Sequence, residues 1–324
     1  MLLTLTPHRW EMVAPFVTAG ETVNHIDVLH VMLEHKSFVG RAETMGVDYF
    51  GETLESLEAE LLALDPAAIA RLDREALQTL LPPGGSRNGL DCALWDLEAK
   101  QTAGGIATLI GVALTPLHTL FTLSLDDPEA MARRAFEAPR LTRLKLKLNP
   151  QEPVDCLQAV REARPDAQLV IDANGSWTPE VMMAVGDALA RFEVALLEQP
   201  LPHGDDAALE NLRYPVALCA DESCQSSADL EAVADRYHAI NIKLDKCGGL
   251  TDALAIREWC QRHGKRVMVG NMLGSSLAMA PALVVAQGAD FVDLDGPMWQ
   301  QSDVEPSLEI DQGCIQPPHS HLWG

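Results

Sequence analysis

The chain has 324 residues, of which 47% are hydrophobic and 22% are charged; this composition supports a large core and excludes a disordered chain. Lys and Arg number 24 against 47 Asp and Glu, which gives a formal net charge of −23. Nucleic acids and anionic membranes are recognised through basic surfaces, so this balance argues against both as partners.

Cysteine usage and the N-terminal segment predict a soluble, cytoplasmic protein. The apolar segment 1–6 is too short for the core of an export signal, because a Pro-His-Arg sequence follows it directly. The seven cysteines form no CxxC pair, and an odd count suits reduced thiols. The uncharged run Val267–Ala289 is interrupted by Gly270 and Pro281, which predicts a strand, a loop and a buried helix in place of a membrane span.

The first 115 residues predict an α+β domain. Leu2–Leu5 and Asp27–Glu34 have strand-like patterns, and a helical region follows them. The predicted helices are Leu54–Ala63, Pro66–Leu72, Arg74–Leu81 and Asn88–Gln101.

Residues 116–324 show one recurring pattern, in which apolar strand-like runs start 22 to 27 residues apart. Each interval leaves room for one crossover helix, and near-continuous apolar strands of this kind predict a parallel sheet buried on both faces. Eight runs predict a closed β/α barrel; an open doubly wound sheet is the alternative, although no GxGxxG follows a first strand. The runs are Thr119–Leu125, Arg143–Asn149, Gln168–Asn174, Val194–Pro200, Val216–Ser223, Ala239–Lys246, Arg266–Met272 and Asp290–Pro297.

Four of the seven lysines lie in these apolar runs, although lysine is rarely buried without a partner. Lys145 and Lys147 share one face of the second run, because side chains alternate along a strand. Lys243 lies in the sixth run. One such lysine is most simply explained by a salt bridge at the barrel mouth. Three lysines with carboxylates on the intervening strands instead indicate a reaction site, where barrel enzymes place their reactive side chains.

Three carboxylates end neighbouring predicted strands: Asp172, Glu198 and Asp221. We expect them to converge on one point, where three like charges require a cation. Oxygen ligands without His or Cys favour Mg²⁺, with Mn²⁺ as a substitute, over Zn²⁺. An acidic residue at a strand end can also be a helix cap or a solvated loop residue. We keep that interpretation for Glu222, Asp205 and Asp206.

A substrate carboxylate held by a metal between lysines suits removal of the proton on its α-carbon. Mg²⁺ and an ammonium group stabilise the negative charge that develops. Lys147 is the predicted base, and Lys145 is the neighbouring ammonium that lowers its pKa. Lys243 is expected on the other side of the same carbon. Two opposed bases permit proton removal from one face and return to the other, which is racemisation or epimerisation.

These motifs resemble those of the enolase superfamily, in its muconate lactonizing enzyme subgroup. The segment Ala93–Lys100 also resembles the capping domain of that family. The motifs are Lys-x-Lys at 145–147, Asp-Ala-Asn-Gly-x-Trp from Asp172, Glu-Gln-Pro from Glu198, Ala-Asp-Glu-Ser around Asp221 and Ile-Lys-Leu-x-Lys-x-Gly-Gly around Lys243.

The resemblance implies a modified TIM barrel of the (β/α)7β type with an N-terminal α+β capping domain. The cap would span residues 1–115 and the barrel residues 116–324, with the C-terminal tail packing back on the cap. It also implies Asp172, Glu198 and Asp221 as ligands of one Mg²⁺ per subunit, and Lys147 and Lys243 as the acid/base pair.

Asp293-Leu294-Asp295 resembles the Asp-x-Asp of dipeptide epimerases, in which two acids hold the free α-ammonium of the substrate. Two carboxylates attract a cation and disfavour a substrate that lacks one, although an isolated Asp-x-Asp can also be a second metal site or a hydrated strand end. The prediction is a Mg²⁺-dependent dipeptide epimerase. It would invert the α-carbon of the C-terminal residue of an L,L-dipeptide by two-base 1,1-proton transfer through an enediolate. The alternatives are an o-succinylbenzoate synthase, N-acylamino acid racemase or cycloisomerase of the same subgroup, and a barrel kept for binding.

The specificity loop of the family corresponds to Pro15–Asn24, which contains Glu21 and neither Arg nor Lys. An inward Glu21 would repel an acidic side chain, so we expect a neutral or cationic second residue rather than Glu. We expect Thr122, Met272 and Ser275 to lie near the substrate, only because of their positions in the sequence. A homo-oligomer is expected, since barrel enzymes of this type commonly self-associate.

Overall fold

The N-terminal sheet consists of three antiparallel strands, β1 (Leu2–Val17), β2 (Thr22–His35) and β3 (Phe38–Thr44), in that order. The computed structural model describes all residues from 1 to 324. The first two strands are much longer than their apolar patterns predict, because pairing continues past a register shift as far as Phe16↔Val23 and Val17↔Thr22. The predicted loop Pro15–Asn24 is therefore a hairpin whose unpaired turn is only 18–21.

Five helices complete the cap: α1 (Leu54–Leu62), α2 (Pro66–Ile69), α3 (Arg74–Leu80), α4 (Gly85–Gln101) and α5 (Gly105–Ile110). The first three begin at polar N-caps, Thr53, Asp65 and Asp73, whose side chains accept backbone N–H groups of the first turn. Helix α4 is buried along most of its length and packs on β2 and β3. Gly40 of β3 allows this close approach, since a Cβ there would collide with the backbone of α4.

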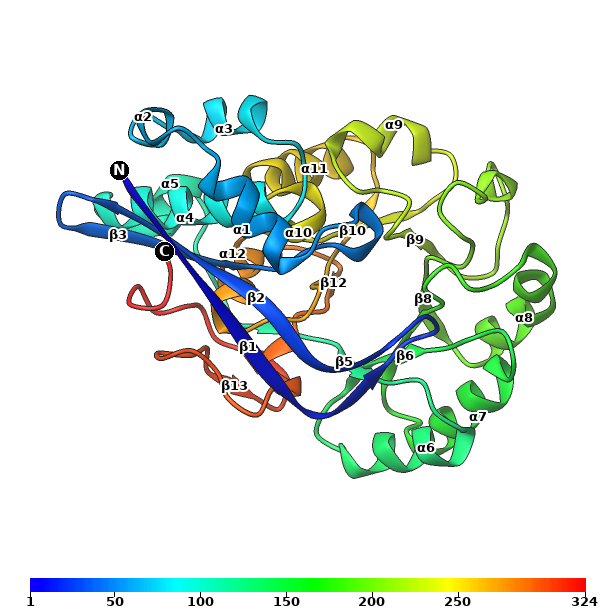
Figure 1. Ribbon diagram of the computed structural model, residues 1–324. Coiled ribbons are helices and arrows are strands. Elements are labelled where there is room, and N and C mark those ends of the chain that lie inside the picture. Colours follow the sequence, from blue (N-terminus) through cyan, green and yellow to red (C-terminus); the bar gives the residue numbers. More distant parts are fainter.

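Eight parallel strands follow in unbroken sequence order and form a ring (Figure 1). The ring closes where Leu120 N donates to Val292 O at 2.7 Å, so the predicted barrel is confirmed and the open sheet is wrong. Every predicted run contains one strand, although residues 244–247 form a helical turn, α10 (Leu244–Cys247), and not the end of a strand. The strands are β5 (Phe121–Leu123), β6 (Arg143–Lys147), β7 (Gln168–Asp172), β8 (Val194–Glu198), β9 (Leu218–Ala220), β10 (Ala239–Ile242), β11 (Arg266–Val269) and β12 (Phe291–Val292).

Helices surround the ring and connect consecutive strands (Figure 1). A 3₁₀ turn (Ala207–Leu209) stands between β8 and β9, and another (Gly296–Trp299) replaces the helix after β12, in agreement with the (β/α)7β prediction. The helices are α6 (Pro128–Glu137), α7 (Pro153–Ala163), α8 (Pro179–Arg191), α9 (Leu230–Val233), α11 (Leu250–Arg262) and α12 (Ser276–Val285). None of the helices combines the length and the apolar character that a membrane crossing requires.

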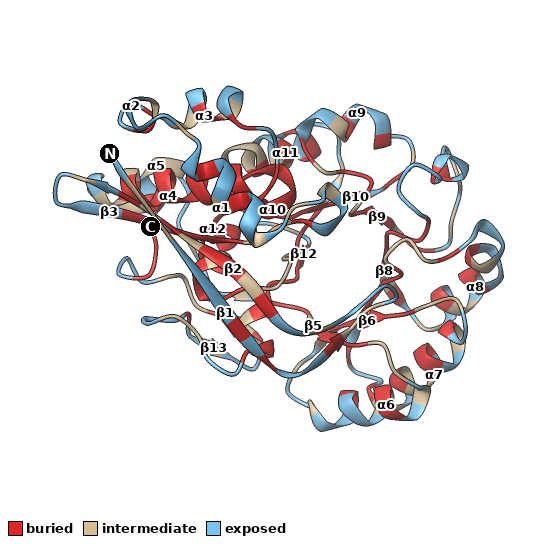
Figure 2. Ribbon diagram, in the orientation of Figure 1, coloured by how far each residue is buried: buried red, intermediate tan, exposed pale blue.

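The barrel strands and α4 are largely buried, whereas much of β1 is exposed (Figure 2). A small apolar cluster that includes Val170, Leu196 and Met268 fills the inside of the barrel. The polar residues described below occupy the C-terminal ends of the strands, above this cluster.

Polar contacts hold the cap over the mouth of the barrel. Asp245 of α10 accepts hydrogen bonds from Thr44 Oγ1 (3.1 Å) and Asn88 Nδ2 (2.8 Å) of the cap. At the end of the chain, Gly324 N donates to Asp96 Oδ1 at 2.7 Å. The loops of the cap can therefore form a wall of the same cavity as the ends of the barrel strands.

Candidate active site

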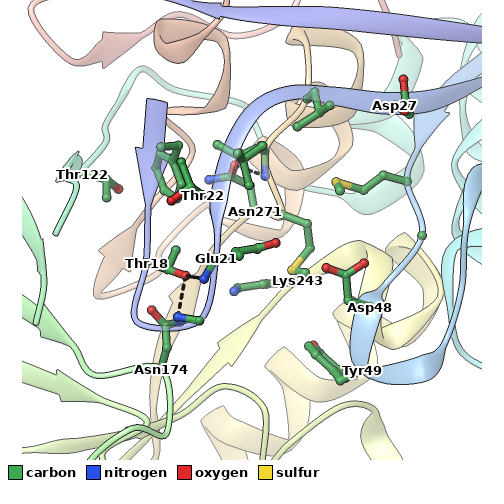
Figure 3. A pocket seen from close by; sticks show the side chains of 18 of the residues that line it. Thr18, Glu21, Thr22, Asp27, Asp48, Tyr49, Thr122, Asn174, Lys243 and Asn271 are labelled. Carbon is green, nitrogen blue, oxygen red and sulfur yellow. Dashed lines mark hydrogen bonds between the residues drawn. The ribbon is translucent and has the colours of Figure 1, made fainter. Parts of the chain in front are cut away.

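A cavity of about 890 Å³ lies between the β1–β2 hairpin, the loop after β3 and the C-terminal ends of the barrel strands (Figure 3). Eight of the residues predicted from the sequence to act on the substrate or to lie near it line this cavity. They are Glu21, Thr122, Lys145, Lys147, Lys243, Met272, Asp293 and Asp295.

Lys145 is the centre of a buried charge cluster. Its Nζ lies 3.0 Å from Asp172 Oδ2, 2.8 Å from Glu198 Oε2 and 2.8 Å from Asp293 Oδ2. Burial lowers the pKa of Lys145, but the three carboxylates outweigh it and hold the pKa well above its usual value. Lys145 is therefore a fixed ammonium group.

The other two lysines face the cavity from separate strands. Lys147 Nζ lies 2.7 Å from Asp172 Oδ2, and Lys243 Nζ lies 2.6 Å from Asp221 Oδ2. Lys147 ends β6 and Lys243 follows β10, with three strands between them in the ring. Burial lowers the pKa of Lys243, but the carboxylates of Asp221, Glu198 and Glu222 together outweigh it, so the pKa lies above its usual value. Lys243 is thus held as an ammonium group paired with Asp221.

Asp172, Glu198 and Asp221 lie at the ends of adjacent strands and are at most 1% exposed. Parallel register places Asp172 beside Glu198. The three side chains do not by themselves form a group that could hold a metal ion. Asp172 and Glu198 both contact Lys145 Nζ, whereas Asp221 Oδ2 contacts Lys243 Nζ. Lysine ammonium groups are thus the positive charges nearest to all three carboxylates.

The donor set nevertheless suits a hard divalent cation, because it is buried, carries only oxygen ligands and is formally triply negative. Glu198 Oε2 makes no aligned hydrogen bond, although it lies close to Lys145. Burial and then Asp172 raise the pKa of Glu198 to about 8. For Asp221, burial raises the pKa, but Lys243 and Lys246 outweigh it and hold the pKa below its usual range.

Asp293 and Asp295 form one wall of the cavity. Asp295 Oδ2 accepts from Thr122 N at 2.7 Å and from Trp299 Nε1 at 3.1 Å. Burial and then Asp293 raise the pKa of Asp295 to about 6. Asp293 Oδ1 is buried without a hydrogen-bond partner, and such an atom is stabilised by a ligand that supplies a donor.

Glu21 lies at the tip of the hairpin and points into the cavity (Figure 3). Thr18 Oγ1 fixes this tip by accepting from the backbone N–H groups of Gly20 and Glu21, both at 3.2 Å. Burial and then Asp48 raise the pKa of Glu21, while Lys147 lowers it. No arginine lines the cavity, and its lysines are Lys145, Lys147 and Lys243 at the ends of the barrel strands.

Ser275 is not brought to the cavity. It is the N-cap of α12, is fully buried and donates its hydroxyl to Glu43 Oε2 at 2.7 Å. Its backbone N–H donates to the same carboxylate, which belongs to the cap. Met272 and Leu273, earlier in the same loop, do line the cavity. The position of Ser275 in the sequence therefore predicted the correct loop. It did not show that Ser275, as the N-cap of α12, faces the cap domain and not the cavity.

Several site residues were missed from the sequence. Glu222, expected as a helix cap or solvated residue, lines the cavity, and burial and then Asp221 raise its pKa to about 7. Its Oε1 accepts from Asn174 Nδ2 at 3.4 Å. Asn174 lies beyond the end of β7 and has a positive φ of 44°, so strand periodicity does not place its side chain. Asp206 is likewise buried, and it accepts from Tyr237 at 2.7 Å.

Two family models match most of the chain. Residues 128–321 match "Enolase C-terminal domain-like", and residues 2–111 match "Mandelate racemase / muconate lactonizing enzyme, N-terminal domain". The L-Ala-D/L-Glu epimerase of Escherichia coli (strain K12) is 41% identical over 307 residues, which cover 94% of this chain and 96% of that protein. An N-acetyl-D-glutamate racemase of Pseudoalteromonas sp is 39% identical over 298 residues, covering 91% and 94%.

Solved structures of similar proteins share the fold. One is an enolase family member from Agrobacterium tumefaciens with homology to dipeptide epimerases, whose structure contains bound sodium and L-Ala-L-Glu. It superposes on this chain with a TM-score of 0.96 at 41% identity, and the match covers 99% of each chain. A dipeptide epimerase from Enterococcus faecalis V583, in complex with Mg and L-Leu-L-Tyr, gives a TM-score of 0.88 at 26% identity and covers 98% of this chain and 96% of its own.

Proposed function

Because the chain belongs to the enolase superfamily, in the mandelate racemase / muconate lactonizing enzyme group, we propose that it is a Mg²⁺-dependent dipeptide epimerase. It would invert the α-carbon of the C-terminal residue of an L,L-dipeptide. One observation carries the proposal: Lys147 and Lys243 reach one cavity from separate strands, and the paired acids Asp293 and Asp295 line the same cavity. Relatives named as epimerases, at up to 41% identity, support it.

Asp172, Glu198 and Asp221 would hold the Mg²⁺, with Mn²⁺ as the expected substitute. When bound, the ion would supply positive charge to stabilise the substrate carboxylate as negative charge develops on its oxygens. Lys145, an ammonium held by three carboxylates, would add a second fixed positive charge beside it.

Lys147 and Lys243 would divide the proton transfer between them. One lysine, as the neutral amine, takes the α-proton from one face of the carbon, and the C–H electron pair moves into the enediolate form of the substrate. The other lysine, as the ammonium, then donates its own proton to the opposite face. The product is the epimer, and the two lysines have exchanged protonation states.

The Asp-x-Asp pair favours this reaction over N-acylamino acid racemisation, despite the 39% identity to an N-acetyl-D-glutamate racemase. The free α-ammonium of a dipeptide can satisfy the unpartnered Asp293 Oδ1 and balance the charge of Asp295. The neutral amide of an N-acyl amino acid leaves that charge unbalanced. The anionic substrates of o-succinylbenzoate synthases and cycloisomerases would be repelled.

Removal of divalent metal is expected to abolish epimerisation. Protein treated with EDTA and dialysed should convert no L-Ala-L-Leu, as followed by polarimetry, and added Mg²⁺ should restore the rate. Circular dichroism before and after treatment controls for loss of fold. Full activity in the chelated, metal-free protein would contradict the proposed role of the three carboxylates.

Glu21→Gln is expected to raise kcat/KM for L-Ala-L-Glu by roughly fivefold, since removing a like charge across a partly screened cavity is worth about 1 kcal/mol. The rate for L-Ala-L-Leu should not change, and Glu11→Gln on the exposed part of β1 is the matched control. Initial rates with the two dipeptides measure the effect. An equal change for both substrates, or no change for either, would show that Glu21 does not face the substrate side chain.

A further inference from the structure

Lys246 is a buried lysine that the proposed reaction does not use. It is 1% exposed and does not line the cavity. It lies on α10, the helical turn that directly follows Lys243. An ammonium group removed from water to this extent needs several acceptors to offset the cost of its burial.

The Lys246 ammonium joins three segments at the mouth of the barrel. It donates to Asp221 O at 2.6 Å and Asp221 Oδ1 at 2.7 Å, and to the carbonyls of Cys224 at 3.0 Å and Asn241 at 3.1 Å. These acceptors lie at the end of β9, in the turn after it, and on β10 below Lys243. Two of the four contacts are to Asp221.

The backbone of Asp221 is also held from a second direction. Gln199 Oε1 accepts from Asp221 N at 2.9 Å and from Ser223 N at 3.1 Å. Gln199 thus holds the N–H groups of this segment, whereas Lys246 holds its carbonyl groups and one oxygen of the Asp221 carboxylate. The bond to the carboxylate bears on how that group is turned.

Two lysines share the Asp221 carboxylate, one on each oxygen. Lys246 binds Oδ1, whereas Lys243 binds Oδ2 and lines the cavity. Lys243 has to leave Asp221 in order to exchange a proton with substrate. Lys246 does not line the cavity, so its bond to Asp221 Oδ1 does not compete with a substrate there.

We propose that Lys246 is a positioning residue, which holds Asp221 Oδ1 and so keeps Oδ2 turned toward Lys243 and toward a divalent cation at the ends of the strands. This inference rests on the proposed metal site. It assigns to Lys246 a role in metal affinity and none in proton transfer, because Lys246 cannot reach the substrate.

The test compares Lys246→Met with the matched control Lys265→Met. Lys265 also donates to backbone carbonyls, those of Ala234 and Tyr237, but has no contact with Asp221. The Kd for Mn²⁺ is measured by electron paramagnetic resonance of the free ion, without substrate, and Tm is measured alongside. Lys246→Met is expected to weaken Mn²⁺ binding about 10–100-fold, the usual effect of losing a group that orients a metal ligand. Lys265→Met should leave the Kd within about twofold.

Three outcomes would overturn parts of this account. Unchanged Mn²⁺ affinity in folded Lys246→Met protein would refute the positioning role alone. Equal weakening in both variants would show that loss of stability, and not of orientation, is responsible. Absence of Mn²⁺ binding in the unaltered protein would refute the metal site and the inference together. If Lys246→Met does not fold, Lys246→Gln replaces it in the test, because Gln keeps one donor for Asp221 Oδ1. Its Kd for Mn²⁺ should be intermediate. A Kd equal to that of the unaltered protein would also refute the positioning role.

Discussion

Lys147→Met and Lys243→Met are each expected to lower the rate of dipeptide epimerisation by about 10²–10⁴-fold, the range by which a positioned acid or base accelerates proton transfer. Each inversion needs one lysine on each face of the α-carbon, so either loss should stop it. Both variants should fold. Asp172 keeps Lys145 when Lys147 is replaced, and Asp221 keeps Lys246 when Lys243 is replaced.

Rates of epimerisation by chiral chromatography, with circular dichroism as the check on folding, measure this effect. Lys36→Met is the matched control, because Lys36 is an exposed lysine in the β2–β3 turn, outside the cavity. Epimerisation at the unaltered rate in both active-site variants would show that these lysines are not the acid/base pair.

Asp295→Asn is expected to raise KM for free dipeptides by about 10–100-fold, equivalent to losing roughly 1.5–3 kcal/mol from a hydrogen bond to a charged group. The amide is nearly isosteric, and its oxygen can still accept from Thr122 N and Trp299 Nε1. The lost element is the negative charge that would hold the α-ammonium.

The comparison that isolates this charge uses N-acetylated dipeptides, which have no ammonium group. Their KM should be high with the unaltered protein and should change little in Asp295→Asn. An equal rise in KM for free and acetylated dipeptides would mean that Asp295 supports the shape of the wall and does not bind the ammonium.

The barrel and its charged strand ends could be predicted because both depend on local pattern. Lys145 and Lys147 alternate with leucines along β6, and parallel register then places Lys147 beside Asp172 and Asp172 beside Glu198. Each step needs only strand periodicity and chain order.

Features that depend on tertiary contacts were not predictable in the same way. The hairpin that carries Glu21 is a continuation of β1 and β2, although polar residues at its sides obscure the strand pattern. Ser275 is turned to the cap by Glu43, which is 232 positions away in sequence. Lys246 was counted among the strand lysines, but the helical turn α10 directs it away from the cavity.

Tyr49 and Asp48 line the cavity from the cap. No motif marks either residue, because the packing of this cap loop over the barrel determines their place. Specificity toward the substrate side chain is therefore the property least accessible to sequence reasoning alone.

Proton NMR in D₂O follows both hydrogen exchange and inversion at the α-carbon of the C-terminal residue of a dipeptide. L-Ala paired with Glu, Leu, Phe, Lys or Arg is incubated with the protein and Mg²⁺, and each sample is repeated with EDTA. The account predicts metal-dependent loss of the α-proton signal of the second residue, together with growth of the signals of the L,D-diastereomer. Retention of every α-proton signal in all five dipeptides with Mg²⁺ present would contradict the epimerase account.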